Sequence, residues 1–200
     1  MSGDSQNAAS LVPVPNHEFC GGRLAVDFCN TLSLLRPAPR DDRLRDLASF
    51  VAWAKRAGWE IAGADAGDLT GFRSLRERLR NLFTAAIDGS PMAAADIDAL
   101  DGAMTDALSA LRLIPGTDRP LSWRDAARPV DRLRHAIARD AVDLLTAAEP
   151  ARLKRCPGED CSWLFYDSSK NGTRRWCAME DCGTRDKVRR FREKQAAPTK

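Results

Sequence analysis

Six cysteines are present in this 200-residue chain, and four of them are spaced like metal ligands. Cys156 and Cys161 form one Cys-x4-Cys pair, Cys177 and Cys182 form a second, and 15 residues separate the two pairs. Two such pairs can converge on one ion in the tetrahedral, four-sulfur geometry that structural zinc prefers. Because four thiolates fill every coordination position, such an ion would stabilise a fold and carry out no chemistry. We therefore expect one structural Zn2+.

Two disulfides or another thiophilic metal are the alternatives for these four thiols. Residues 1–16 contain no basic start followed by an apolar run, so no secretory signal is visible. Cysteine pairs of a chain that stays in a reducing compartment more often hold metal, and we expect a cytoplasmic protein. The remaining cysteines, Cys20 and Cys29, lie far away along the chain in an apolar stretch, where buried, inert thiols are expected.

The net charge of +3 conceals an asymmetry along the chain. Residues 151–200 contain 13 Lys and Arg against 7 Asp and Glu, a net charge of +6. The first 150 residues contain 18 against 21, a net charge of −3. The positive field therefore belongs to the cysteine-rich end, as expected of a part that meets a polyanion. Every apolar run falls short of the ~20 residues that a membrane helix needs, so we expect no membrane partner.

Apolar residues at helical spacing predict a mainly α fold ahead of the cysteine pairs. We expect a flexible tail at 1–18, a helical domain of about five helices at 19–149, and a small treble-clef-like zinc finger, with a β-hairpin and a helix, at 152–196. The helical domain is long enough to bury its own core, whereas a finger of about 45 residues needs its metal to fold. The expected elements of the helical domain are helices near 24–32, 44–57, 69–88, 90–111 and 129–148 and a short strand at 121–123.

Within the finger, an aromatic-rich strand at 163–167, a turn at 168–172 and a returning strand at 173–176 are predicted. A helix should then run from Thr184, as its cap, to about residue 194. On this helix Val188 and Phe191 are expected to pack on the hairpin. Trp163 and Trp176 flank the cysteines, and we expect them to cover the metal site rather than to stack on bases.

Basic residues are dense on the predicted finger helix and on the strand before it. Clustered arginines near a helix terminus are suited to phosphate contacts and to guanine edges. The alternative is a merely solvated helix supported by ion pairs between its own side chains. We expect nucleic acid, DNA before RNA, to be the partner. The candidate nucleic-acid-binding residues are Arg174, Arg175, Arg185, Lys187, Arg189, Arg190 and Arg192.

Two polar residues interrupt the apolar N-terminal helix. Asp27 and Asn30 are three residues apart, beside the glycine pair Gly21 and Gly22, which permits close backbone approach. They form either a pocket for a small-molecule effector or, as we expect, a hydrogen-bonded pair that braces a neighbouring segment. A ligand-binding or protein-interaction module, with the finger as a structural element, is therefore the alternative function.

Side chains typical of catalysis are sparse. The two histidines, His17 and His135, lie in no recognisable nucleophile or metal spacing. No pair of carboxylates can be nominated as acid and base. We therefore expect a protein that is not an enzyme. A row of Arg73, Arg76 and Arg80 fits a solvated face, which we expect, or a dimer contact, and the sequence leaves the oligomeric state open.

Two segments resemble known bacterial families. The four cysteines, with Trp163, Asp167, the run Arg174-Arg175-Trp176 and the run Cys182-Gly183-Thr184-Arg185, resemble the CGNR zinc finger. The opening Gly21-Gly22-Arg23-Leu24-Ala25-Val26-Asp27-Phe28 resembles the ABATE-like domain that precedes this finger. The resemblance implies a stress-induced transcription regulator with zinc on the four cysteines and a DNA-binding finger. It also implies Asn where this chain has Thr184, which has no amide to bind a base bidentately.

Overall fold

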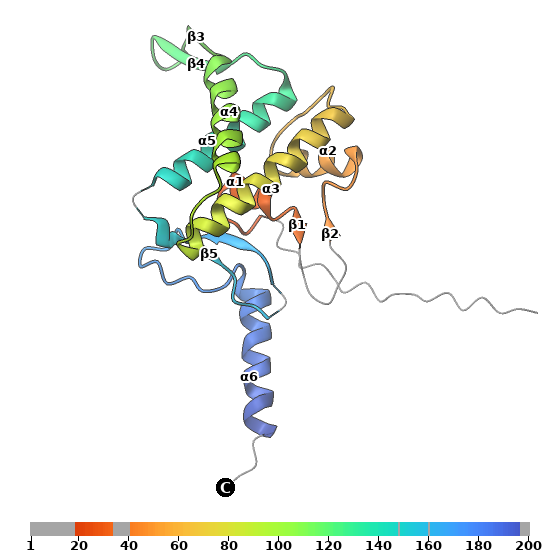
Figure 1. The fold of residues 1–200 in the computed structure, drawn as a ribbon, viewed down its shortest axis with the longest axis vertical. Coiled ribbons are helices and arrows are strands. Elements are labelled where there is room, and N and C mark those ends of the chain that lie inside the picture. The colour runs from red at the N-terminus through yellow and green to blue at the C-terminus, as the bar shows by residue number, and fades with distance from the viewer. Residues whose placement is uncertain (1–18, 34–40, 148, 160, 197–200) are drawn as a thin grey trace, which may run out of the picture.

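The computed structural model describes residues 19–33, 41–147, 149–159 and 161–196. The predicted tail at 1–18, with His17, lies outside the described residues. In the described part, six α-helices and three two-stranded antiparallel sheets confirm the mainly α fold class (Figure 1). The helices are α1 (Leu24–Cys29), α2 (Leu47–Arg56), α3 (Ala66–Asp88), α4 (Ala94–Ser109), α5 (Pro129–Thr146) and α6 (Thr184–Ala196). The strands are β1 (Leu32–Ser33), β2 (Asp41–Asp42), β3 (Leu111–Pro115), β4 (Leu121–Asp125), β5 (Leu153–Arg155) and β6 (Leu164–Tyr166).

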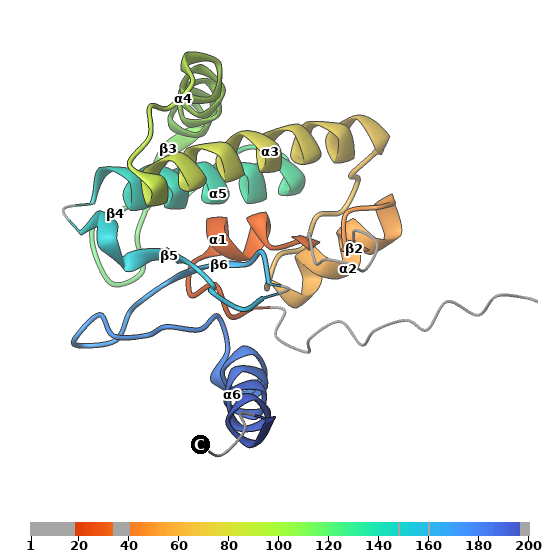
Figure 2. The same cartoon turned by 60° about the horizontal axis from the view of Figure 1, so that its bottom comes forward.

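The short helix α1 lies at the centre of the core. Its residues from Ala25 to Cys29 are all buried, and it contacts α3, α5 and β6. Phe28 packs against Trp53 of α2 with the two rings tilted by 49° and meets Phe72 of α3 edge-on. The view in Figure 2 places α3 and α5 on one side of α1 and the β5–β6 hairpin on the other. The sequence predicts this helix, and only the three-dimensional packing explains why so short an element is stable.

Side-chain caps begin α2 and α3, whereas α1, α4 and α5 start without one. An Asp65–Asp68 capping box begins α3, and Gly89, with φ of 63°, ends it. The predicted start of the next helix at Ser90-Pro91 is wrong, because α4 begins at Ala94 without a side-chain cap. Its predicted end at 111 is also wrong, since β3 starts there and pairs with β4, which extends the predicted strand at 121–123.

The arginine row of α3 is not the solvated face that the sequence predicts. Arg76 is 2% exposed and donates to both carboxylate oxygens of Asp42, at 2.6 and 2.9 Å. Arg73 donates to the carbonyl of Leu44, and Arg80 donates to that of Cys29. Two of these guanidiniums satisfy backbone carbonyls, at the end of α1 and before α2, and the third pairs with a carboxylate of β2. Such long-range partners cannot be read from the period of a single helix.

The zinc-finger hairpin differs from the predicted one. Strand β6 pairs with β5, which precedes the first cysteine, and residues 173–176 form no strand. Leu153 of β5 and Leu164 of β6 are buried in the same core cluster as α1, α3 and α5. Period-two patterning cannot choose between two neighbouring partners for one strand, and burial of these leucines against α1 and α3 decides in favour of β5. The hairpin therefore belongs to the main core.

Helix α6 projects away from the rest of the molecule (Figure 1). Figure 2 shows the same separation after a turn of 60°, with α6 below the hairpin and remote from α3 and α5. Val188 and Phe191 are 43% and 62% exposed, so their predicted packing on the hairpin is wrong. None of the described helices combines the length and apolar composition needed to cross a membrane.

Candidate metal centre and the basic helix

The four predicted metal ligands converge in the structure. Their sulfur atoms all lie within 4.8 Å of one another, with 3.7 Å between Cys161 and Cys177 and 3.6 Å between Cys177 and Cys182. Tetrahedral zinc with Zn–S bonds of about 2.3 Å requires sulfur separations of about 3.8 Å. Both the donor set and the spacing fit zinc. The four cysteines thus form the site for one structural Zn2+, and no coordination position is left for a substrate.

The first cysteine pair lies in a tight turn between β5 and β6. The amide of Cys156 donates to the carbonyl of Trp163 at 2.9 Å, and the amide of Cys161 donates to that of Gly158, also at 2.9 Å. A Cβ atom on Gly158 would lie 3.0 Å from the Cβ of Cys161 and 3.3 Å from the sulfur of Cys182. A side chain at 158 would therefore crowd Cys161 and the sulfur cluster, which favours glycine in this turn.

The second cysteine pair leads directly into α6. Met179–Gly183 form a single wide turn of π-helix, continuous with α6, and Cys182 lies within it. A Cβ atom on Gly183 would come within 3.2 Å of the Trp176 ring and closer still to the Met179 sulfur. Thr184 is not the predicted N-cap, since it already has helical backbone angles and its hydroxyl donates to the carbonyl of Met179 at 3.2 Å. The metal ligand is thus part of the helical segment that it anchors.

Aromatic rings and positive charge surround the sulfur cluster. Trp163 is buried in the same cluster as three of the cysteines, and Trp176 packs against it, which supports covering of the site over base stacking. Arg185 of α6 donates to the Cys182 sulfur at 3.2 Å. A zinc ion with four thiolates has a net charge of −2, which a nearby guanidinium offsets. Arg185, predicted to contact nucleic acid, is therefore placed beside the metal.

Comparisons with known families match this architecture along the chain. A family profile of the CGNR zinc finger matches residues 152–195, and that of ABATE, described as "Putative stress-induced transcription regulator", matches residues 22–148. The ABATE match covers more than half of the chain. The chain belongs to the ABATE family. We refer to 22–148 as the ABATE region and to 152–195 as the CGNR finger. Neither description is that of an enzyme, and no match to a curated protein was found.

Asp167 organises the loop of the CGNR finger between β6 and the second cysteine pair. Its carboxylate is fully buried and accepts hydrogen bonds from the Lys154 ammonium at 2.7 Å, from the amide and hydroxyl of Ser169, and from the Arg174 amide at 2.8 Å. Burial by itself would raise the pKa of Asp167, but these donors outweigh it and hold that pKa well below its usual range. The loop is therefore fixed around one buried charge.

Arg174 connects the CGNR finger to the segment just before the ABATE region. Its guanidinium donates to the carbonyls of Trp176, at 3.0 Å, of Cys177, and of Cys20, at 2.6 Å, and lies 4.7 Å from the centre of the Phe165 ring. The nitrogen donors Nε and Nη2 of the Arg174 guanidinium are therefore bonded to carbonyls of the protein itself. The prediction that Arg174 binds nucleic acid is not supported by this placement, and its role in the structure is to hold two backbone segments together, one at Cys20 and one at Trp176 and Cys177.

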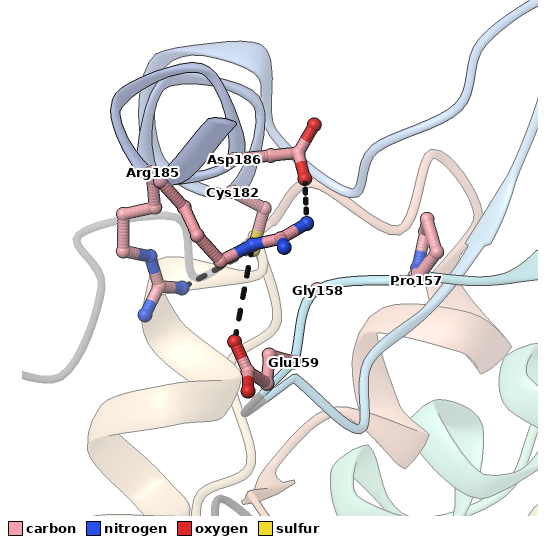
Figure 3. A pocket seen from close by; sticks show the side chains of 7 residues that line it. Pro157, Gly158, Glu159, Cys182, Arg185 and Asp186 are labelled. Atoms are coloured by element: carbon pink, nitrogen blue, oxygen red, sulfur yellow. Dashed lines mark hydrogen bonds and ion pairs between the residues drawn. The ribbon is translucent and has the colours of Figure 1, made fainter. Parts of the chain in front are cut away.

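Two of the predicted contact residues on α6 are paired with carboxylates. Arg189 donates to Asp186 and Glu193, both at 2.7 Å, and Arg190 forms an ion pair with Asp186 at 2.8 Å. Arg189 also forms an ion pair with Glu159 of the first cysteine turn at 3.9 Å, and Figure 3 shows Arg185, Asp186 and Glu159 around the same cavity, which has a volume of about 350 Å³. This side of α6 is electrostatically balanced and turns toward the finger itself.

The opposite side of α6 has unpaired cations around an apolar centre. Residues spaced by three and four share one helical face, and Thr184, Val188, Phe191 and Gln195 have this spacing and are all exposed. Lys187, Arg192 and Lys194 flank that face, and none of the three forms an ion pair with another described residue. The sequence places Lys194 on the basic side of this helix but gives no signal for Gln195, and the expected packing of Val188 and Phe191 on the hairpin removes them from the exposed candidates. We call these seven residues the outer face of α6.

Asp27 and Asn30 are both buried and bonded to backbone. Asn30 donates to the carbonyl of Leu164 at 2.8 Å and accepts from its amide at 3.0 Å, so it completes the free edge of β6. Asp27 accepts from the amide of Gly21 at 2.7 Å. This arrangement agrees with the bracing pair expected from the sequence. An effector pocket at these residues stays a prediction that no observation tests.

Proposed function

We propose that this protein is a DNA-binding transcription regulator and that α6 is the element that enters the DNA groove. The observation that carries this proposal is the outer face of α6, which combines exposed apolar groups with three cations that form no ion pair with another described residue, on a helix that projects from the body. A major groove about 12 Å wide admits one α-helix. The net charge of +6 over residues 151–200 favours a polyanionic partner.

The residues of the outer face divide into two roles. Lys187, Arg192 and Lys194 are suited to phosphates on the two sides of a groove, where they would supply affinity without sequence preference. Gln195 has the amide that can bind adenine through two hydrogen bonds, and the apolar side chains of Val188 and Phe191 are suited to thymine methyl groups. Arg175, exposed and lying over the Trp176 ring, is a further cation on the same finger.

Zinc would contribute by fixing where α6 begins. Cys182 lies in the turn that continues into α6, and Cys156 and Cys161 come from the turn between β5 and β6, whose leucines lie in the main core. A helix of 13 residues with high charge is marginally stable in isolation, so an anchored N-terminus determines both its direction and its order.

We infer that the protein acts by binding rather than by catalysis. The four-thiolate site leaves no position for a substrate. His135, the histidine within the described residues, is 4% exposed and hydrogen-bonded through Nδ1 to Asp125 at 2.7 Å, so it braces β4 against α5.

Titration of zinc-loaded full-length protein against a random duplex pool tests the proposal. We expect binding at 50 mM salt and a slope of log affinity against log salt of roughly −3, from about 0.9 per phosphate for the three cations of the outer face. Selection from the same pool should enrich a defined sequence. Absence of duplex binding at low salt would overturn the proposal, and preferential binding of structured RNA would replace DNA with RNA as the partner.

A further inference from the structure

A fifth thiol lies against the metal centre, contrary to the expectation of an inert and distant Cys20. Cys20 is half-buried and packs on the cluster that contains the zinc ligand Cys177. It is 157 residues away from Cys177 along the chain, so no spacing in the sequence points to the pair. Cys29, by contrast, is fully buried in the core of the ABATE region.

Several contacts fix Cys20 in this position. One nitrogen of the Arg174 guanidinium, Nη2, donates both to the carbonyl of Cys20 and to that of Cys177. The following residue, Gly21, accepts a hydrogen bond from the Tyr166 amide at 2.7 Å and donates to Asp27. Gly22 then adopts a positive φ of 77°, where an added Cβ would lie 3.1 Å from the Tyr166 carbonyl. The segment around Cys20 is thus built onto the finger.

We propose that Cys20 is the redox partner of Cys177 and that peroxide joins the two in a disulfide, which removes one ligand from the zinc site. The four metal ligands alone do not need a fifth thiol, because zinc is saturated by four sulfurs. A half-buried thiol that adjoins a buried ligand is the arrangement in which a small oxidant reaches one sulfur and the other resolves the product.

The reaction balances with a peroxide as the oxidant. The Cys20 sulfur, as thiolate, attacks one oxygen of hydrogen peroxide, the O–O bond breaks, and hydroxide leaves, which gives a sulfenic acid. The Cys177 thiolate then leaves the metal and attacks the sulfenic sulfur, the S–O bond breaks, and a second hydroxide leaves. The two sulfurs together lose two electrons, and the peroxide gains them. A dithiol reductant reverses the disulfide by exchange.

Loss of Cys177 from the site reaches α6 directly. Cys177 and Cys182 lie on the same short segment. The turn Met179–Gly183 begins two residues after Cys177, contains Cys182 and leads into α6. With three thiolates left, the affinity for zinc falls and the start of α6 loses its anchor. Oxidation of Cys20 thereby controls whether α6 is folded. This control does not depend on which macromolecule α6 binds.

The test follows zinc release from the full-length, zinc-loaded protein under hydrogen peroxide, with a chromogenic chelator. The variants are Cys20→Ser and, as a matched control that removes a thiol outside the cluster, Cys29→Ala. We expect one zinc per chain in all three proteins before oxidation. Release should be slower in Cys20→Ser by about tenfold or more, because an adjacent thiol resolves a sulfenic acid intramolecularly. Release should be unchanged in Cys29→Ala.

Peptide mapping of the oxidised protein supplies the second readout. We expect a Cys20–Cys177 disulfide in the wild type, and its reduction should restore zinc binding. Equal release rates in wild type and Cys20→Ser, or disulfides between the four ligands only, would overturn the proposal. A Cys20→Ser protein that lacks zinc from the start would also overturn it, since Cys20 would then be a ligand. Because DNA takes no part in either readout, these outcomes are independent of the DNA-binding proposal.

Discussion

Single polar side chains connect the two family-matched parts of this chain. Asn30 of the ABATE region binds both backbone groups of Leu164, and Arg174 of the CGNR finger binds the carbonyl of Cys20. Each contact joins residues that are more than 100 positions apart, and the residues next to Asn30 or Arg174 in the sequence do not indicate the partner. The sequence indicates a bracing role for Asn30 from its position on an apolar helix, but it cannot indicate the partner, which lies 134 residues away.

Replacement of Asn30 tests this connection. In Asn30→Ala the buried amide and carbonyl of Leu164 lose their partner, and each unsatisfied group costs about 1–3 kcal/mol. We expect the free energy of unfolding, from urea denaturation of the zinc-loaded protein, to fall by roughly 2–4 kcal/mol. Asn171→Ala, at an exposed loop position, is the matched control and should change it little. Equal stability of both variants would contradict the bracing role.

Asp27 should make stability depend on pH. Burial raises its pKa to about 7, an effect increased by Asp140 and opposed by the Gly21 hydrogen bond and by Arg174. Because the folded-state pKa is above the unfolded value, the folded state gains stability as pH falls below about 7 and loses it as pH rises through that value. We expect a loss on the order of 2 kcal/mol between pH 5 and pH 8.

The isosteric variant Asp27→Asn should remove most of this dependence, because an amide oxygen can still accept from Gly21 and carries no charge. Asp98→Asn, on an exposed position of α4, serves as the control. The measurement is the urea midpoint of zinc-loaded protein at four pH values from 5 to 8. The same pH dependence in Asp27→Asn and wild type would assign the titration to another group.

At the scale of elements, the five helices of the ABATE region are predictable mainly from their apolar periods, since among them only α2 and α3 begin with a side-chain cap. The strand pairing of the hairpin and the packing of α6 are harder to predict from the sequence. The strand at Leu164–Tyr166 is correctly placed, but its partner is chosen by burial of Leu153 and Leu164 in a core that the sequence does not display. Val188 and Phe191 have the spacing of a buried stripe, yet the structure leaves them exposed, so amphipathic spacing indicates a shared face and not what covers it.

Zinc removal should affect α6 selectively. We expect chelation to disorder the finger from residue 177 onward, because the anchor of α6 is lost, while α3 and α5 keep their packing in the apolar core. Hydrogen exchange with mass spectrometry should show fast exchange across Thr184–Ala196 and continued protection of α3 and α5. Unchanged protection of α6 after complete chelation would mean that the metal does not hold the helix.

At the scale of the whole molecule, the main core and the finger share one set of contacts. The sequence predicts a helical domain that is self-sufficient and a finger that is an appendage. In the structure, Leu153 and Leu164 lie in the main core, and Arg80 of α3 reaches the carbonyl of Ser162 at 3.4 Å. Composition and family matches divide the chain near residue 150. In the structure, however, residues from both sides of that boundary pack into one core.

Truncation after residue 149 should therefore destabilise the helical part. Loss of β5 and β6 uncovers apolar surface of α1 and α3, and each missing buried leucine contributes about 1.5–3 kcal/mol. Since small domains are stable by only about 5–15 kcal/mol, we expect the 1–149 fragment to have a clearly lower urea midpoint than the full chain. An identical midpoint for the fragment would contradict the shared core and restore the picture of an independent appendage.

The central claim is that the outer face of α6 binds DNA while its inner side is neutralised within the finger. Two double variants with the same loss of charge separate these sides: Lys187→Ala with Arg192→Ala, and Arg189→Ala with Arg190→Ala. The decisive measurement is the salt dependence of duplex affinity for both zinc-loaded variants. We expect the outer pair to lower affinity and to reduce the salt slope by about 1.8, and the inner pair to change the slope little. Equal losses from both pairs, or a larger loss from Arg189 and Arg190, would contradict the assignment of the binding face.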